Sequence, residues 1–326
     1  MSGASAAPGW RSPAAVLRLL AGLGILGCLL ALLPRERVWS AMRGVPLRLW
    51  LAVVFAYLAA HCLGTMKYRM MVNLAGAGLS RAQAAQCYFG GLFGTLFLPS
   101  IVGGDVVRAG VGLRVARHRA GFLLGSLMDR VMDVLALALT SAAGAVLLPG
   151  HLDARSLRVF LLLASAGAAL VAGSAVAVAL LPAARFSFRM RRRLVRLREA
   201  ARALRARPHV MLLSLLGGIL VQGTFATLTA VLANSCGLHL GLSVWFLAWP
   251  LAKLAALLPL SQGGLGVREA ALAGLLLPFG APAALAVAVG LVWQTVIYSG
   301  GLLSGLVALL ARSVERREED PHAHPG

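Results

Sequence analysis

The stretch LPSIVGGDVVR, at residues 98–108, lies inside a long apolar region, and LPLSQGGLGVR at residues 258–268 follows the same spacing. In each copy a Leu-Pro pair is followed by Gly-Gly and then by an arginine, nine residues after the proline. Proline removes a backbone donor and disrupts a helix, and a Gly-Gly pair lets the chain turn and approach a ligand closely. The two stretches therefore predict a broken helix in each of the apolar regions 84–120 and 243–279.

The surrounding sequence has the composition of a polytopic membrane protein. Of its 326 residues, 59% are hydrophobic and 13% are charged, whereas a soluble domain is about half apolar and a quarter charged. Runs of about 20 apolar residues cross the hydrocarbon as helices, because an unclosed strand would leave backbone groups unpaired in lipid. We expect a single all-α membrane domain with about six spanning helices, near residues 16–33, 47–65, 121–148, 157–181, 210–233 and 284–311.

The formal net charge of +20 reflects membrane topology rather than nucleic-acid binding. The basic residues cluster between apolar segments, as expected of cytoplasmic loops, and nearly all are arginine, with Lys67 and Lys253 as the only lysines. Residues 185–207 contain ten arginines and one glutamate. The linker 182–209 is either an amphipathic helix held on the cytoplasmic leaflet by anionic lipid or a solvated loop that fixes topology. Both alternatives place it inside.

The linker divides the chain into a first half at residues 47–181 and a second half at 210–311. The N-terminal residues 1–15 and the tail 312–326 are then cytoplasmic. In this arrangement region 84–120 enters the membrane from the cytoplasm and region 243–279 enters from outside. We therefore expect two re-entrant hairpins of an inverted repeat, the arrangement in which paired Gly/Pro interruptions mark the substrate site of many transporters.

Loop charges alone do not decide between a hairpin and a full span at residues 84–103. The hairpin places the basic loop 34–46 outside, against the usual bias. A full span places that loop inside but puts Lys67, Arg69 and Arg81 outside. The repeated spacing favours the hairpin.

The repeat also predicts where a ligand binds. The half-helix after each break presents free N–H groups and the positive end of its dipole, which suit an anion. Arginine suits phosphate, and a charge at membrane depth costs about 2.5–3.5 kcal/mol, so it usually has a partner or lines a wet cavity. Arg108 and Arg268 either bind a lipid headgroup or only set topology. Asp105 and Glu269 are either their partners or acceptors for a cationic headgroup, and Gln262 can donate or accept.

Helix 121–148 carries a second group of charges, at Asp129, Arg130 and Asp133. Asp129 and Asp133 lie one turn apart on one face. The group forms either a structural ion pair or part of the lining of a translocation path.

Three stretches taken together resemble a known family. LPSIVGGDVVR, SLMDRVMD at residues 126–133 and LPLSQGGLGVREAAL are similar to the flippase-like membrane domain of lysylphosphatidylglycerol synthases and its stand-alone relatives, over roughly residues 15–311. The resemblance implies that the chain moves lipids between leaflets. Many relatives carry a basic residue in the last helix where this chain has Trp293 and Gln294. The positions that match the family pattern are Gly103, Gly104, Asp105, Arg108, Asp129, Arg130, Gly263, Gly264, Gly266, Arg268 and Glu269.

The synthases add a soluble aminoacyl-transfer domain, and we expect none after the last helix here, so the chain is predicted not to be an enzyme. The GxGxxG match at residues 22–27 lies in an apolar helix without a preceding strand, and the four cysteines form no CxxC pair, so no nucleotide, metal or other cofactor is expected.

The expected partners are membrane lipids with an anionic headgroup and no nucleic acid; a homo-oligomer or a separate lipid-modifying enzyme remains open. The expected location is a bacterial cytoplasmic membrane. Two alternatives to a flippase are an intramembrane lipid-modifying enzyme that uses Asp105, Asp129 or Glu269 as general base, and a scaffold that recruits a partner through residues 185–207.

Overall fold

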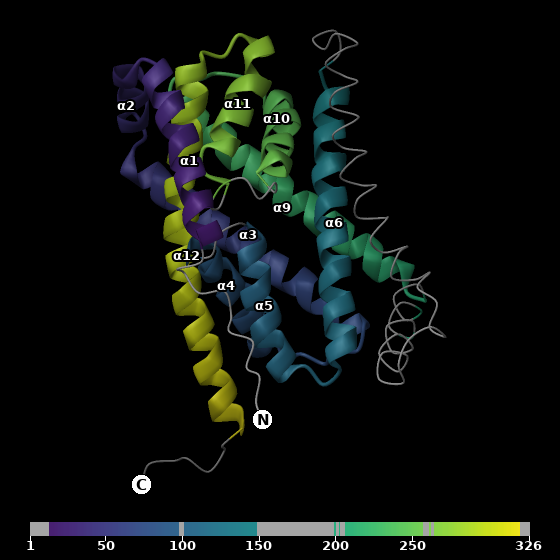
Figure 1. Cartoon of the computed structure of the whole chain (residues 1–326). Helices are drawn as coiled ribbons and strands as arrows, with labels where there is room; N and C mark the ends of the chain where they lie inside the picture. The colour runs from purple at the N-terminus through teal and green to yellow at the C-terminus, as the bar shows by residue number, and fades with distance from the viewer. Residues whose placement is uncertain are drawn as a thin grey trace.

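In the computed structural model the described residues are 13–97, 101–148, 199, 202, 206–256, 261 and 264–319. This part of the chain is all-helical, as predicted, and contains no β-strand. Figure 1 shows the helices, which are α1 (Pro13–Leu32), α2 (Arg35–Arg43), α3 (Leu47–Leu74), α4 (Arg81–Phe97), α5 (Ile101–Val115), α6 (Arg119–Val146), α9 (Pro208–Ser235), α10 (Leu242–Ala255), α11 (Val267–Leu276), the 3₁₀ turn Leu277–Phe279 and α12 (Ala283–Glu319).

Three of the described helices are long and apolar enough to cross a membrane, at Leu47–Leu74, Pro208–Ser235 and Ala283–Glu315. They coincide with three of the predicted spans. Helix α6 has 28 residues, and at about 1.5 Å per residue it exceeds the hydrocarbon thickness, but its charged residues lower its hydropathy. The predicted span 157–181 and most of the arginine-rich linker lie outside the described residues, so the count of six spans stays a prediction.

Helix α3 is longer than predicted, since it ends at Leu74 instead of near residue 65. The interpretation of Lys67 and Arg69 as loop residues is therefore wrong. Lys67 is 5% exposed within the helix and pairs with two aspartates of α6, which explains how an apolar helix accommodates a lysine. The region 34–46, predicted as a loop, contains helix α2.

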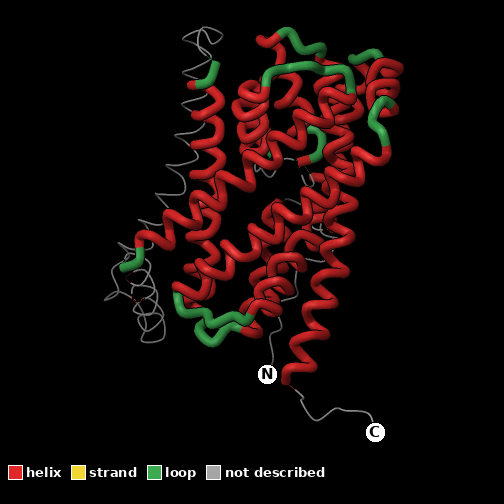
Figure 2. Tube along the Cα trace, turned by 180° about the vertical axis from the view of Figure 1, so that it is seen from behind, coloured by secondary structure: helices red, strands yellow, loops and turns green. Residues whose placement is uncertain are grey.

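The two interrupted regions form two helix pairs at opposite ends of the molecule. Figure 1 shows α4 and α5 in the lower half and α10 and α11 in the upper half, with the helix ends next to both interruptions near mid-height. Helix α4 packs against α5 and α12, and α10 packs against α6, α9 and α11. Loops gather at the two ends of the bundle, as the view from behind in Figure 2 shows.

The two similar stretches fold differently in detail. In the first stretch Gly103 and Gly104 lie inside α5, so they do not form the turn that the sequence predicted. A Cβ atom on Gly104 would lie 2.3 Å from Thr95 Cγ2 and 2.6 Å from the Gly91 carbonyl oxygen, so this glycine allows α4 and α5 to pack closely. In the second stretch Gly264 and Gly266 have φ angles of +79° and +80° and form the turn before α11.

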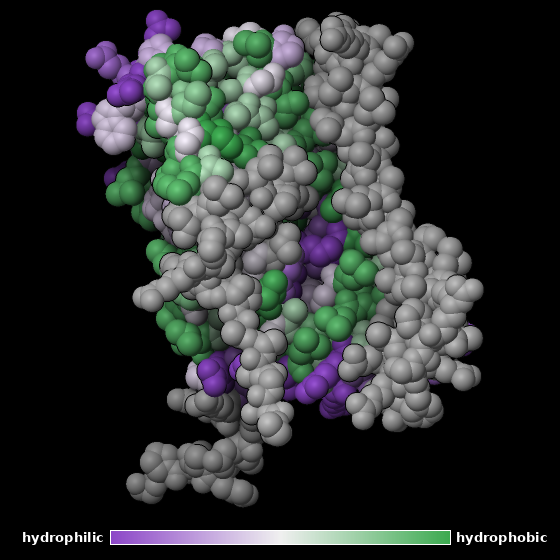
Figure 3. Space-filling view, in the orientation of Figure 1, coloured by the Kyte–Doolittle hydropathy of each residue, from purple (hydrophilic) through white to green (hydrophobic). Residues whose placement is uncertain are grey.

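On the face shown in Figure 3, the described residues of the side surface are mostly hydrophobic, and hydrophilic residues gather mainly toward the two ends. Many leucines of α9 and α12 are more than half exposed, among them Leu213, Leu220, Leu302 and Leu309. Such an apolar surface is suited to contact with lipid chains rather than water.

Candidate functional site

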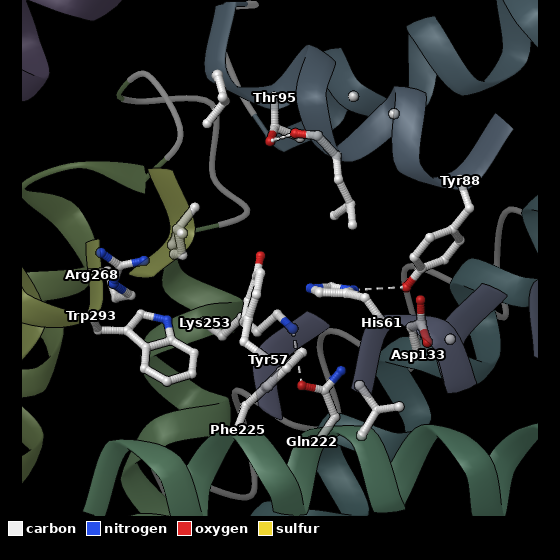
Figure 4. Close-up of a pocket in the computed structure, with 18 of the residues that line it drawn as sticks. Tyr57, His61, Tyr88, Thr95, Asp133, Gln222, Phe225, Lys253, Arg268 and Trp293 are labelled. Atoms are coloured by element: carbon white, nitrogen blue, oxygen red, sulfur yellow. Dashed lines mark hydrogen bonds between the residues drawn. The ribbon is translucent and has the colours of Figure 1, made fainter. Parts of the chain in front are cut away.

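A cavity of about 340 Å³ lies between the two helix pairs. Its lining includes residues of α4 and α5 from the lower pair and α10 and α11 from the upper pair, together with α3, α6, α9 and α12. Figure 4 shows the open space, with Arg268 and Trp293 on one side, His61 and Tyr88 on another, and Gln222 and Phe225 on α9. The cavity is therefore a meeting point of segments far apart in sequence.

Charged residues of α3, α5 and α6 form one ion-pair network beside this cavity. The Lys67 ammonium lies 2.5 Å from Asp129 Oδ1 and 2.8 Å from Asp133 Oδ1. The Arg130 guanidinium pairs with Asp105 of α5 and lies 3.6 Å from Asp133 Oδ2. Because buried charges are costly unless paired, the network explains how five charged side chains fit into this part of a membrane-type bundle.

Arg108 belongs to the same network but is held more loosely. Its guanidinium lies 3.8 Å from Asp129 Oδ2 and 3.9 Å from Asp105 Oδ1. It also lies over the rings of Tyr88 and Tyr68, at 4.5 and 4.9 Å from their centroids, where cation–π attraction favours it. Arg108 is the eighth residue of α5, so it lies about two turns into the helix.

Arg268 lies at the start of α11 and has its own partners. Its Nη2 donates to Glu269 Oε1 and to Gln294 Oε1, both at 2.6 Å. The other carboxylate oxygen, Glu269 Oε2, accepts the backbone N–H of Gly266 at 2.7 Å. The prediction that this helix start presents free N–H groups to an anion is therefore wrong in part, because the chain's own Glu269 occupies it.

Lys253 is the remaining cation of the cavity lining. Its Nζ donates to Gln222 Oε1 at 3.0 Å and lies 5.1 Å from the centroid of the Phe225 ring. No described carboxylate forms an ion pair with it. Nearby, His61 Nδ1 and the Tyr88 hydroxyl form a hydrogen bond of 3.2 Å, which Figure 4 marks with a dashed line.

The structure brings most of the predicted site residues together. Gly104, Arg108, Arg130 and Arg268 line the cavity. Asp105, Asp129 and Glu269 lie behind the lining and pair with those arginines or with Lys67. Gly103 and Gly264 have backbone positions in α5 and in the turn before α11. Gln262 and Gly263 lie outside the described residues, as do Pro99 and Pro259.

Several lining residues were absent from the predicted site. The charged and polar ones include Lys67, His61, Gln222, Lys253 and Asp133. Of these, the sequence analysis had named only Asp133 as part of a charged group. A usable signal was present in the sequence. Both lysines of an otherwise arginine-based chain, and two further polar residues, lie within apolar segments, where polar groups are expensive and usually functional.

The network reaches the side surface of the bundle at Asp105 and Arg130, whose side chains are 30% and 37% exposed. They join α5 to α6, two helices that otherwise make few contacts. Figure 3 shows hydrophilic side chains within a hollow at mid-height, between hydrophobic surfaces. The polar interior is thus accessible from the side of the bundle.

Comparison with known families gives a match over most of the chain. The family described as the lysylphosphatidylglycerol synthase TM region matches residues 15–305, nearly the whole chain. The chain therefore belongs to this family, and it is an integral membrane protein with a membrane lipid-related function. It matches no curated protein and no solved structure.

Proposed function

We propose that this member of the lysylphosphatidylglycerol synthase membrane-region family is a lipid translocator, which moves a lipid with a phosphate-bearing, anionic headgroup between leaflets. The observation that supports this proposal most strongly is that five cations line one cavity: Lys67, Arg108, Arg130, Lys253 and Arg268. These cations come from both helix pairs and from α3 and α6, and they lie inside a bundle with a hydrophobic side surface.

The proposed path enters from the side, between α5 and α6. The headgroup passes the partly exposed pair of Asp105 and Arg130 and enters the cavity, while the acyl chains stay in contact with lipid. This route avoids transfer of the headgroup through hydrocarbon, which is the main barrier to spontaneous movement of a charged lipid.

We further propose that the two helix pairs are the corresponding parts of an inverted repeat. Their placement at opposite ends of the bundle supports this, as does the shared spacing of their sequences. Arg81, Arg114 and Arg119 lie at the end formed by the start of α4, the end of α5 and the start of α6. By the basic-inside bias, we assign this end and both termini to the cytoplasm of a bacterial inner membrane.

The described geometry gives no specific support to the two alternatives. An enzyme would need a free general base in contact with substrate, whereas Asp105, Asp129 and Glu269 are all paired with cations. Asp129 and Glu269 are also buried. The scaffold alternative rests on residues 185–207, most of which lie outside the described residues.

Reconstitution tests the proposal directly. Purified protein is incorporated in liposomes that contain a fluorescent phosphatidylglycerol, and a membrane-impermeant quencher reports how much probe becomes accessible outside. We expect movement above that of empty liposomes. Ile297→Trp introduces a large ring into the cavity lining and should slow this movement by about tenfold or more, because the headgroup no longer fits.

Leu302→Trp on the same helix is the matched control, since Leu302 is 58% exposed on the outer surface and a tryptophan there should leave the rate unchanged. Equal rates for protein-containing and empty liposomes would refute lipid translocation. Equal rates for the Ile297→Trp variant and the unmodified protein would remove the cavity from the path.

A further inference from the structure

We propose that Lys253 is the ligand of the headgroup phosphate, and that the cavity selects phosphodiester lipids that carry one net negative charge. This inference rests on the proposed function and deepens it. The sequence pattern left Arg108 and Arg268 either as headgroup ligands or as residues that only set topology; the structure assigns the role of phosphate ligand to a lysine outside both Gly-Gly stretches.

The positive and negative side chains around the cavity do not cancel completely. The lining cations Lys67, Arg108, Arg130 and Arg268 each lie within 4 Å of at least one carboxylate. The carboxylates that form ion pairs with these cations are those of Asp105, Asp129, Asp133 and Glu269. Formal charges in this group cancel. Among the described residues Lys253 is then the one lining cation in excess, and it leaves the cavity with one uncompensated positive charge.

The local contacts of Lys253 make its ammonium available to a ligand. An ammonium has three donors, and the structure shows one used, by the neutral Gln222 amide oxygen at 3.0 Å. Figure 4 shows the side chain extending from α10 toward α9 beside the open space. An amide oxygen positions the ammonium without neutralising it, so a phosphate oxygen can still form a charge-assisted bond with it.

Unpartnered polar atoms around the same cavity support a ligand with several acceptor oxygens. Arg108 Nε, Arg268 Nε, Trp249 Nε1 and His61 Nε2 are buried and have no hydrogen-bond partner within the described part of the chain. All four residues are more than nine-tenths buried, and all four line the cavity. Buried polar groups are normally satisfied, and three of these atoms, Arg108 Nε, Arg268 Nε and Trp249 Nε1, are N–H donors of the kind that phosphate and hydroxyl oxygens accept from.

The one uncompensated positive charge of the cavity lining predicts which lipid headgroups the cavity prefers. A phosphodiester with a neutral polyol headgroup brings one negative charge, which Lys253 compensates. A zwitterionic headgroup brings an additional cation next to an already positive lining. A phosphomonoester can carry a second negative charge that no remaining cation neutralises. We therefore expect phosphatidylglycerol to bind better than phosphatidylcholine or phosphatidic acid.

Ligand-dependent thermal stabilisation in detergent tests binding separately from transport, because a ligand that binds the folded state raises Tm. The probes are phosphatidylglycerol, phosphatidylcholine and phosphatidic acid, each titrated as mixed micelles. We expect the unmodified protein to bind phosphatidylglycerol about tenfold more tightly than phosphatidylcholine. Lys253→Gln should abolish this preference, and Lys253→Arg should retain most of it. Arg48→Gln removes the same charge from an exposed position at the start of α3 and should change nothing.

The outcomes separate this inference from the proposed function. A retained preference in Lys253→Gln, or no preference in the unmodified protein, overturns the inference; the second result does so even if the glutamine variant fails to fold. Equal stabilisation by soluble glycerophosphoglycerol would assign the site to a soluble phosphodiester and overturn the lipid ligand. A normal binding preference without movement in liposomes would instead overturn translocation and leave Lys253 as a lipid ligand.

Discussion

Asp129 is the carboxylate that pairs with two buried cations of the ion-pair network, Lys67 and Arg108. It is 1% exposed, it lies 2.5 Å from the Lys67 ammonium, and its second oxygen is the closest carboxylate oxygen to Arg108, at 3.8 Å. An ion pair buried this deeply adds little net stability, but removal of one partner is costly because the other charge is left unpaired. Asp129 thus holds two cations that come from different helices.

We expect Asp129→Asn to destabilise the protein by about 3–5 kcal/mol, measured as a fall in Tm in detergent. The double variant Lys67→Met/Asp129→Asn should lose less than the single variant, because it removes one charge of each sign and Asp133 keeps Arg130 as its partner. Asp133→Asn is the comparison, since Asp133 is 24% exposed and shares the same lysine, and it should have a smaller effect. An Asp129→Asn protein as stable as the unmodified chain would contradict this role.

At the scale of elements, the two similar stretches show that one sequence spacing can adopt two backbone structures, a helix in α5 and a turn before α11. The Pro/Gly-Gly spacing correctly predicted an interruption in both regions. It could not predict that Gly103 and Gly104 continue as helix while Gly264 turns with a φ of +79°. The difference depends on tertiary packing, because Gly104 allows contact with Gly91 and Thr95 of α4. The sequence around Gly104 carries no information about this contact with another helix.

Gly104→Ala should force α4 and α5 apart, because its Cβ would lie 2.3 Å from Thr95 Cγ2. We expect a loss of about 1–3 kcal/mol, typical of overpacking, seen as a lower Tm. Gly110→Ala on the same helix is the matched control, since a Cβ there has no neighbour within 4 Å, and it should be neutral or slightly stabilising. Equal Tm values for the two variants would show that the helices do not depend on close approach at Gly104.

For the whole molecule, the opposed helix pairs predict a specific pattern of accessibility. Ser80 and His118 flank the α4–α5 pair, and His239 and Pro282 flank the segment that contains α10 and α11. Single cysteines are introduced at these four positions in a background without native cysteines, and intact cells are treated with an impermeant thiol reagent. We expect labelling at positions 239 and 282 and none at 80 and 118 unless the membrane is permeabilised.

Opposite accessibility within either pair of positions would mean that the interrupted region crosses the membrane. In that case the inverted repeat would be wrong, although the helices themselves would remain. The assay therefore tests topology alone, independently of lipid movement.

Composition and apolar runs were sufficient to predict the all-helical class and the spans that became α3, α9 and α12. The repeated stretches predicted three of the residues that line the cavity, Gly104, Arg108 and Arg268, and the charged group on helix 121–148 predicted Arg130. Lys67 and Lys253 could not be placed in the same way. Their roles depend on Asp133 and Gln222, which lie on other helices far along the chain, and spacing within one segment carries no information about such partners.

The contact between Arg130 and Asp105 has a mechanical consequence. It joins α5 to α6 at the side surface, and Arg130 also lies 3.6 Å from Asp133 on its own helix. The proposed lipid path requires α5 and α6 to separate at this contact. Because Arg130 has a second carboxylate partner, separation of α5 from α6 would not leave its guanidinium unpaired, and a buried charge is costly only when it lacks a partner.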